Sequence, residues 1–239
     1  MLTPIPASEI SRARKLSASM GMFFGLSHPQ GDQPWTPVSR LYRVDGGQLR
    51  TLLATVQDTV GGGEDRVAAS LVFQGFVSRL VSPMLACTML HGCLPRLPVS
   101  RLYFRPGDGE LLKLAAEGTD GYTGPVLELL DELVTTLCDS HATPLTQALV
   151  SQVSISSKLL RGNTAAAIVS GIRLVSHHSG HDWRELAAHV LQQPQLHGAG
   201  WLQRKEPGFV RYSCCLYYRV PNGGLCGDCS LTHNPLAGR

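Results

Sequence analysis

The sequence predicts an α+β fold, in which a mostly helical domain with a small antiparallel sheet or hairpin is followed by a cysteine-rich tail. Three observations predict it. Helical spacing of apolar residues recurs through most of the first 199 positions, an alternating segment with a Pro-Gly-Asp-Gly turn lies near 101–115, and four of the seven cysteines lie between Cys214 and Cys229. With 43% hydrophobic and 16% charged residues, the 239-residue chain has the composition of a protein with a sizeable core.

Three helices are expected in the first 91 residues. The first spans 8–25, with Ser8 as its cap. The second places four apolar residues at the spacing i, i+3, i+4, i+7, and they are Leu49, Leu52, Leu53 and Val56. The third, 66–91, is apolar on all sides and is therefore expected to be buried, with a kink near Pro83.

The hairpin follows this buried helix, and helical patterns then return. Alternation through Leu102 and Phe104, and through Leu112 and Leu114 beyond the turn, predicts the two strands. Helices are expected over 124–139, 143–160, 163–177 and 181–192, with one helix ending at Gly162 and the next capped by Asn163. We therefore divide the chain into a helical body, 1–199, and a C-terminal segment, 200–239.

Several classes of protein are disfavoured by composition. A net charge of +3 with no run of basic residues gives no indication of nucleic-acid binding. The first 20 residues lack the apolar stretch of a secretory signal, and Gln74, Arg79 and Pro83 interrupt the most apolar segment. We expect a cytoplasmic protein, and a peripheral contact with the inner face of the cell membrane remains open.

The cysteines near the C-terminus are compatible with a disulfide pair, a zinc site or an iron–sulfur cluster. In a reducing compartment, clustered thiols indicate metal or redox chemistry more often than disulfides. Cys226 and Cys229 have the spacing of a metal knuckle, but adjacent residues such as Cys214 and Cys215 point to opposite faces of a strand and grip one ion poorly. A [2Fe–2S] cluster is larger than one ion and tolerates a wider arrangement of four thiolates. The other cysteines, Cys87, Cys93 and Cys138, are expected to be buried structural thiols.

The pattern CC-x10-C-x2-C resembles the C-terminal [2Fe–2S] segment of FhuF-like siderophore-iron reductases. The stretch RGNTAAA, 161–167, is similar to a Gly-Asn-x-Ala stretch of that family, and VSRLVSPMLAC, 77–87, to its central helix. The resemblance implies that Cys214, Cys215, Cys226 and Cys229 bind the iron of a [2Fe–2S] cluster. It also implies that the protein is a ferric-siderophore reductase, with no catalytic residue beyond the cluster.

The electrons are expected to come from a partner. The sequence contains neither a G-x-x-x-x-G-K-[ST] nor a G-x-G-x-x-G motif, so an external donor such as a ferredoxin or a flavoprotein reductase is implied. A face for the ferric siderophore or the donor is expected at Arg211, Tyr217, Tyr218 and Arg219, and the alternative is that these residues hold the tail onto the helical body. Two other functions stay open, namely an iron–sulfur redox sensor or electron-transfer protein without its own substrate, and a binding protein with a structural zinc knuckle.

Overall fold

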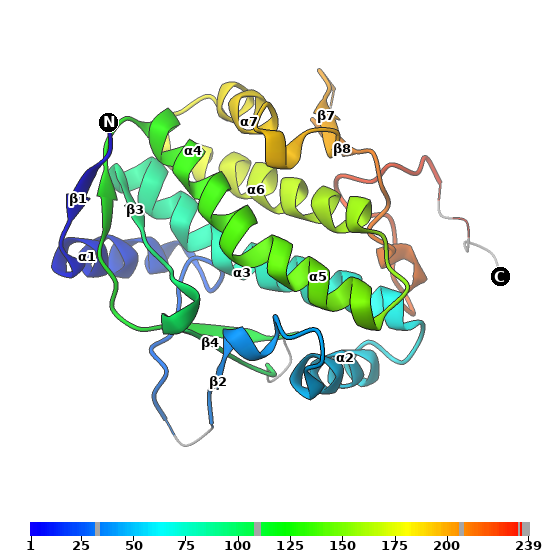
Figure 1. Cartoon of the computed structure of the whole chain (residues 1–239). Helices are drawn as coiled ribbons and strands as arrows, with labels where there is room; N and C mark the ends of the chain where they lie inside the picture. The colour runs from blue at the N-terminus through cyan, green and yellow to red at the C-terminus, as the bar shows by residue number, and fades with distance from the viewer. Residues whose placement is uncertain (32–33, 108–110, 206–207, 234, 236–239) are drawn as a thin grey trace.

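Two long helices, α3 (Asp65–His91) and α6 (Ser157–Ser179), pack along each other at the centre of the protein (Figure 1). The structure is a computed structural model and describes residues 1–31, 34–107, 111–205, 208–233 and 235. Within those residues the α3–α6 contact is the most extensive between any two elements. The fold is α+β, with small antiparallel sheets around a mostly helical body, as the sequence predicts.

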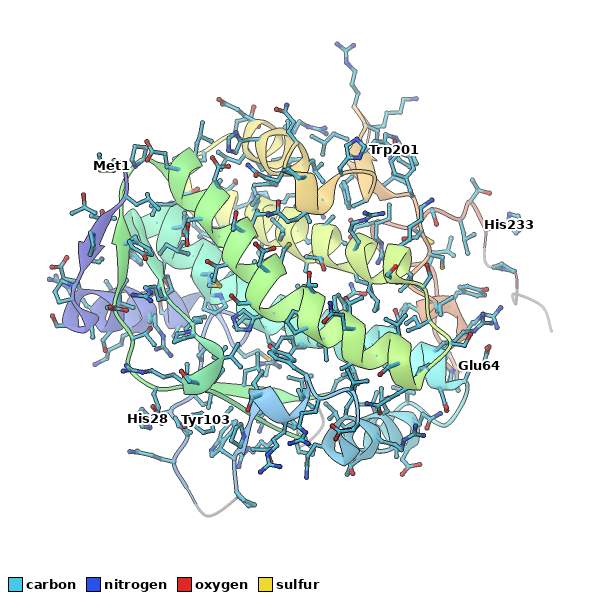
Figure 2. The ribbon with its side chains drawn as sticks, viewed as in Figure 1. Met1, His28, Glu64, Tyr103, Trp201 and His233 are labelled. Atoms are coloured by element: carbon cyan, nitrogen blue, oxygen red, sulfur yellow. The ribbon has the colours of Figure 1, made fainter. Side chains whose placement is uncertain are left out.

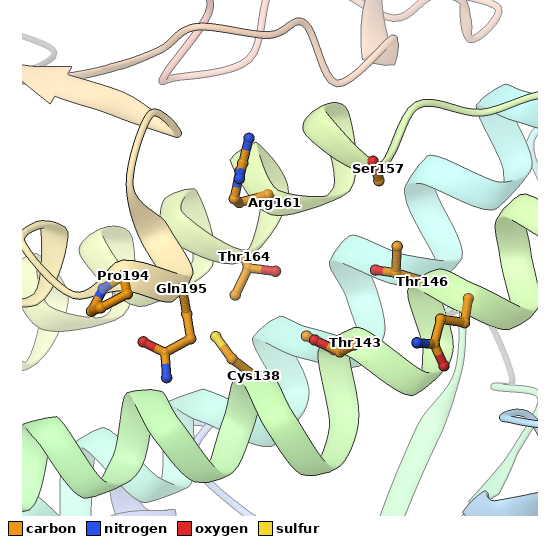
Figure 3. Close-up of a pocket in the computed structure, with 10 residues that line it drawn as sticks. Cys138, Thr143, Thr146, Ser157, Arg161, Thr164, Pro194 and Gln195 are labelled. Atoms are coloured by element: carbon orange, nitrogen blue, oxygen red, sulfur yellow. The ribbon is translucent and has the colours of Figure 1, made fainter.

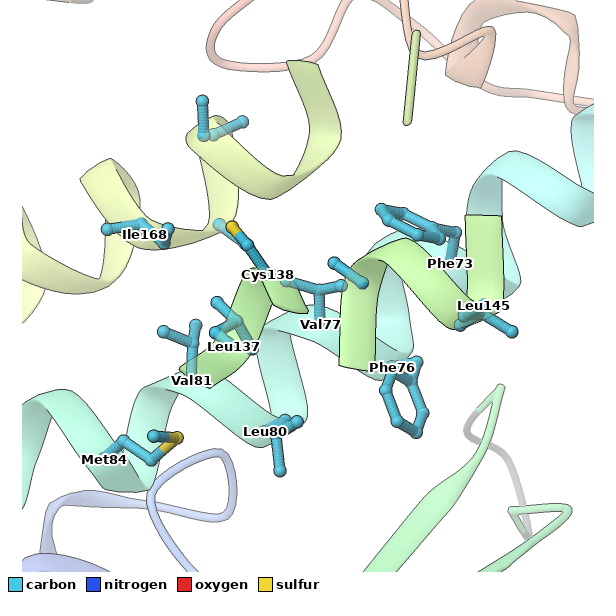
Figure 4. Close-up of a cluster of buried hydrophobic side chains, with 14 of the residues drawn as sticks. Phe73, Phe76, Val77, Leu80, Val81, Met84, Leu137, Cys138, Leu145 and Ile168 are labelled. Carbon is cyan, nitrogen blue, oxygen red and sulfur yellow. The ribbon is translucent and has the colours of Figure 1, made fainter. Parts of the chain in front are cut away.

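Helix α3 is the core helix. Figure 4 shows its Phe73, Phe76, Val77 and Leu80 among side chains from the neighbouring helices, and all four are fully buried. The helix continues through Pro83 as one element from Asp65 to His91 and ends at Gly92, which adopts a left-handed conformation. By length and composition α3 resembles a membrane span, but 72% of its most apolar window is buried inside the protein.

A helical rod covers one side of the α3–α6 pair. It consists of α4 (Val126–Leu137), a π-helical turn (Cys138–Ala142) and α5 (Thr143–Gln152). The π turn carries His141, which is fully buried between the Tyr42 hydroxyl, 2.9 Å from its Nδ1, and the Leu97 carbonyl, 2.9 Å from its Nε2. Burial lowers the pKa of His141 to about 4, although the bond to Leu97 opposes this shift.

The N-terminal helices lie at the periphery. Helix α1 (Ala7–Ser17) begins after Pro6 and ends well before residue 25, so the expected helix was too long and Ser8 is not its cap. A short 3₁₀ turn and an isolated strand residue follow it. Helix α2 (Gly47–Thr59) buries Leu49, Leu52, Leu53 and Val56 together, which confirms the helix that their spacing predicts.

The strands form three small antiparallel sheets in the described part of the chain. In the order in which they are paired, these are β1 (Thr3–Ile5), β6 (Gly121–Thr123) and β3 (Cys93–Pro95); β2 (Thr36–Pro37), β4 (Leu102–Arg105) and β5 (Lys113–Ala116); and β7 (Gly200–Leu202) and β8 (Phe209–Arg211). Strands β4 and β5 are the predicted hairpin, with Leu102 opposite Ala116. Its Pro-Gly-Asp-Gly turn falls partly outside the described residues.

Helix α6 corrects one expectation about the sequence RGN. The chain neither ends a helix at Gly162 nor starts one at Asn163, because both residues lie inside α6, whose cap is Ser156. The physical reason is tertiary: Gly162 and Asn163 contact the C-terminal segment and α3, as described below. Helix α7 (Trp183–Leu191) follows, capped by the Asp182 carboxylate, and leads to β7. The proposed boundary at residue 200 coincides with the first residue of β7 and stays a prediction.

Candidate metal centre

The four clustered cysteines lie on the segment that follows β8. Cys214 and Cys215 follow this strand after two residues, and a short 3₁₀ helix, Tyr217–Arg219, comes next. Cys226 and Cys229 lie on one tight turn, closed by a hydrogen bond of 3.2 Å from the Cys229 amide to the Cys226 carbonyl. In Figure 1 this segment runs beside the end of the α3–α6 pair.

Cys214 and Cys215 lie outside strand β8 and are followed by a backbone turn. They are therefore not held on an extended strand, where neighbouring side chains would point to opposite faces. Leu216 has a φ of 69°, a left-handed conformation that is uncommon for a residue with a side chain. The turn brings the Leu216 amide to 3.3 Å from the Cys214 sulfur. The Leu231 amide similarly donates to the Cys229 sulfur at 3.4 Å. Both thiols therefore have a backbone donor, as sulfur ligands of iron–sulfur clusters commonly do.

The four thiols are close enough to interact. The Cys215 thiol hydrogen-bonds with Cys214 and lowers the pKa of Cys214 to about 7, against burial and the nearby thiols of Cys229 and Cys226. A hydrogen bond that the Cys226 thiol donates to Cys215, together with burial, raises the pKa of Cys226. Within the described ranges, no three Cys, His, Asp or Glu side chains form a group that could hold a single metal ion. The cysteines nevertheless belong to one cluster of interacting sulfurs.

Arg211 is the charged partner of this sulfur cluster. Its side chain is fully buried, one of the largest fully buried side chains in the protein. Its Nη2 donates to the Cys226 sulfur at 2.7 Å, and its Nη1 donates to the Asn163 Oδ1 at 2.6 Å. Burial lowers the pKa of Arg211, but the neighbouring thiols of Cys215 and Cys226 outweigh it and raise the pKa overall. Arg211 therefore lies beneath the expected substrate or donor face and not on it.

A buried chain of hydrogen bonds connects the cysteines to the helical body. Asn163, on α6, donates through Nδ2 to the Ser70 hydroxyl at 3.0 Å and to the Ser70 carbonyl at 3.2 Å. The Ser70 hydroxyl, on α3, donates to the Cys215 carbonyl at 2.7 Å. The chain Cys215–Ser70–Asn163–Arg211–Cys226 thus fixes the segment at both cysteine pairs. Ser70 was not predicted from the sequence, in which its only signal is a small polar residue within an apolar helix.

Gly162 allows the segment to approach α6. A Cβ atom at this position would lie 2.5 Å from the Ser213 hydroxyl and 3.8 Å from Cδ of Arg211. Ser213 also donates to the Lys158 carbonyl, on the same face of the helix, at 3.3 Å. The glycine in the middle of α6 is therefore explained by close packing against the cysteine segment, which compensates for its poor helix propensity.

The remaining residues of the expected face divide into two groups. Arg219 forms an ion pair with Glu64 at the start of α3, and its Nε donates to the Tyr218 hydroxyl at 3.0 Å, so both residues help to hold the segment in place. Tyr217 is exposed. Trp201 and Tyr212 are also exposed and their ring centroids lie 5.0 Å apart, with Trp201 near the outer edge of the molecule in Figure 2.

The donor set fits an iron–sulfur group. Four thiols, two of which accept from a backbone amide, lie near a buried guanidinium whose Nε is itself buried and has no hydrogen-bond partner among the described residues. Such a donor beside sulfur ligands is suited to an anionic group.

Residues 211–231 match the family described as FhuF 2Fe-2S C-terminal domain. The match contains all four cysteines together with Arg211, and it confirms the resemblance that the cysteine spacing predicts. The cofactor of this FhuF-type segment is a [2Fe–2S] cluster. No curated protein matches the chain. Cys87, Cys93 and Cys138 lie outside the matched residues and are buried, as expected.

Two cavities flank helix α6. The polar one, about 310 Å³, lies between α5 and α6 (Figure 3), and its wall includes Thr143, Thr146, Ser157, Arg161 and Gln195. The other, about 410 Å³, lies between α3, α6 and the loop after α1. Its lining residue Ser170 donates to Asp228, in the Cys226–Cys229 turn, at 3.4 Å.

Proposed function

We propose that this protein reduces ferric siderophores, converting chelated Fe³⁺ to Fe²⁺ in one-electron steps and releasing iron in the cytoplasm. The observation that carries the proposal is the FhuF 2Fe-2S match over four interacting thiols. When bound, the [2Fe–2S] cluster supplies one-electron transfer. The role of the chain is to hold the cysteine segment against α3 and α6, to exclude water from one side of it and to bind the chelate nearby.

Reduction suffices to release the iron. Siderophores hold Fe³⁺ through hard, anionic oxygen atoms, whose attraction depends on the charge of the ion. When the ion gains one electron, each of these bonds weakens and Fe²⁺ can pass to other ligands. No bond of the siderophore breaks, so no general acid, base or nucleophile is required from the protein.

The polar cavity between α5 and α6 is our candidate for the chelate site. Its volume lies at the lower end of the range for ligand pockets, about 300 to 1,000 Å³. Hydroxyl groups and the exposed cation Arg161 suit a polar, anionic chelate. Ser157 and Arg161 lie on the face of α6 next to Lys158 and Gly162, which contact Ser213 of the FhuF-type segment.

We further propose that an external donor, such as a ferredoxin or a flavoprotein reductase, docks at the exposed aromatic residues Trp201, Tyr212 and Tyr217. All three are exposed, Tyr212 and Tyr217 lie within three residues of Cys214, and the Trp201 ring packs against that of Tyr212. A peripheral position on the inner face of the cell membrane, close to imported siderophore, is compatible with the proposal. The free thiols of all seven cysteines suit a reducing compartment.

The test is a single-turnover reaction under anaerobic conditions. Protein reduced with dithionite and freed of excess reductant is mixed with a ferric siderophore in the presence of a chelator that forms a coloured complex with Fe²⁺. We expect one Fe²⁺ for each cluster reoxidised. Cys214→Ser should abolish the reaction together with the visible bands, whereas Cys93→Ala, at a buried thiol on β3, should retain both.

One further variant and two outcomes separate the alternatives. Thr146→Trp fills the polar cavity, and we expect the siderophore concentration for half-maximal rate to rise about tenfold with an unchanged cluster spectrum. A reduced protein that no ferric siderophore reoxidises, but that passes its electron to another protein, would identify an electron-transfer protein or sensor. A colourless protein with stoichiometric zinc would contradict the iron–sulfur assignment itself.

A further inference from the structure

Arg211 combines three properties that a surface-anchoring residue does not need. It is fully buried, its Nη2 lies 2.7 Å from a cysteine sulfur, and its Nε has no hydrogen-bond partner within the described part of the chain. Burying an arginine in an apolar interior is costly unless anionic groups compensate its charge. The Asn163 oxygen is neutral, so the anionic partners of the guanidinium are the cysteine sulfurs, the group that they bind and the Asp228 carboxyl group.

We propose that Arg211 raises the reduction potential of the FhuF-type centre and that Asn163 and Ser70 position it for this role. The two hydrogen bonds of the guanidinium define its place, because Asn163 accepts from Nη1 while Nη2 donates to Cys226. Asn163 is itself held by Ser70, so the position of the positive charge is set by α3 and α6 together. This inference goes beyond the proposed function, since it concerns the cluster and not its substrate.

The direction of the effect follows from charge. Two Fe³⁺ ions, two sulfide ions and four thiolates carry a net charge of about −2, and one added electron makes the charge about −3. A fixed positive charge a few ångströms away stabilises the reduced form more than the oxidised form, because the attraction grows with the negative charge. The hydrogen bond to Cys226 acts in the same direction, since it withdraws negative charge from the sulfur.

One acidic group, Asp228, lies near Arg211 and opposes its effect. Asp228 is the nearest carboxyl group on the same segment, and the Arg211 amide donates to its carbonyl at 3.1 Å. Burial raises the pKa of Asp228, opposed by Arg211 and Arg173, so two cations face this one carboxyl group. The Asp228 carboxylate also accepts from Ser170, which orients it toward α6.

The experiment is a potentiometric titration of the intact, cluster-loaded protein, followed by EPR and visible absorption. For Arg211→Met we expect the equilibrium constant for reduction to fall at least tenfold, which is about 59 mV for a one-electron couple. Arg211→Lys keeps the positive charge, so its equilibrium constant for reduction should fall less than that of Arg211→Met. The matched control is Arg219→Met. Arg219 lies on the same segment as Arg211, and its loss removes an anchoring ion pair to Glu64 at the start of α3. This variant should keep the wild-type reduction potential.

A second variant covers the case in which Arg211→Met fails to bind iron. Asn163→Asp keeps an oxygen in front of Nη1 but adds a negative charge, and it should also lower the equilibrium constant at least tenfold. If cluster-loaded Arg211→Met or cluster-loaded Asn163→Asp had the wild-type reduction potential, the inference would be overturned and Arg211 would be an anchor only. Equal shifts in Arg211→Met and Arg219→Met would also overturn it. Neither measurement uses a siderophore, so the inference stands or falls independently of the proposed reaction.

Discussion

Asn163 connects the helical body to the FhuF-type segment, and its replacement by alanine tests that connection. The variant removes one hydrogen bond from the buried guanidinium of Arg211 and two to Ser70. A hydrogen bond to a charged group contributes about 1.5 to 3 kcal/mol, and each of the two neutral hydrogen bonds contributes roughly 1 kcal/mol. We expect Asn163→Ala to lower the free energy of unfolding by about 4 kcal/mol, a large share of the 5 to 15 kcal/mol typical of folded proteins.

The assay is urea unfolding followed by circular dichroism, with iron content measured after gel filtration. In thermal unfolding of a chain of this length, the same loss of about 4 kcal/mol lowers the melting temperature by roughly 10 °C. Leu174→Ala is the matched control, because this side chain lies on α6 but is 50% exposed, and its effect should stay below about 0.5 kcal/mol. A loss of less than about 1 kcal/mol in Asn163→Ala, with full iron content, would refute the view that this network holds the segment.

Two further predictions concern the helical body. Because the pKa of His141 is lowered to about 4 in the folded state, from about 6.5 in the unfolded chain, the unfolded state binds more protons between these values and stability falls as pH decreases from 6.5 to 4. Between pH 7 and 4, the free energy of unfolding measured in urea should fall by about 3 kcal/mol more in the wild type than in His141→Gln. Equal losses in the two proteins would contradict the lowered pKa of His141. A Cβ on Gly171 would lie 2.5 Å from Cδ1 of Leu85, so Gly171→Ala should cost about 1 to 3 kcal/mol, and Leu85→Val should relieve part of it in the double variant. Additive losses in the double variant would show that the two sites do not contact each other.

Local pattern was sufficient for several elements. The spacing of Leu49, Leu52, Leu53 and Val56 predicted α2, because a helix places those positions on one face. The apolar run that became α3 was correctly predicted to be a buried helix, and β4 and β5 formed the predicted hairpin. The first helix was predicted too long at its C-terminal end, because α1 ends at Ser17 and a short 3₁₀ turn then leads to Gly21, whose φ of 137° no helix continues through.

The error at Gly162 and Asn163 has a different origin. Glycine followed by asparagine is the usual signature of a helix end followed by a new cap, and sequence analysis therefore divided α6 in two. In the folded protein these residues serve partners that lie far away in the chain, Ser70 and Arg211. A local signal cannot distinguish a cap from a contact that only the folded chain makes.

The sequence alone identified the cofactor of the C-terminal segment, and the tertiary structure decided the surroundings of its cysteines. The spacing of Cys214, Cys215, Cys226 and Cys229 identified the [2Fe–2S] segment, because ligand type and separation are properties of a short stretch of chain. The role of Arg211 was not visible there: it was grouped with surface residues, and the fold buries it against Cys226. Burial and long-range hydrogen bonds depend on which helices pack together, so they exist only once α3, α6 and the C-terminal segment have met.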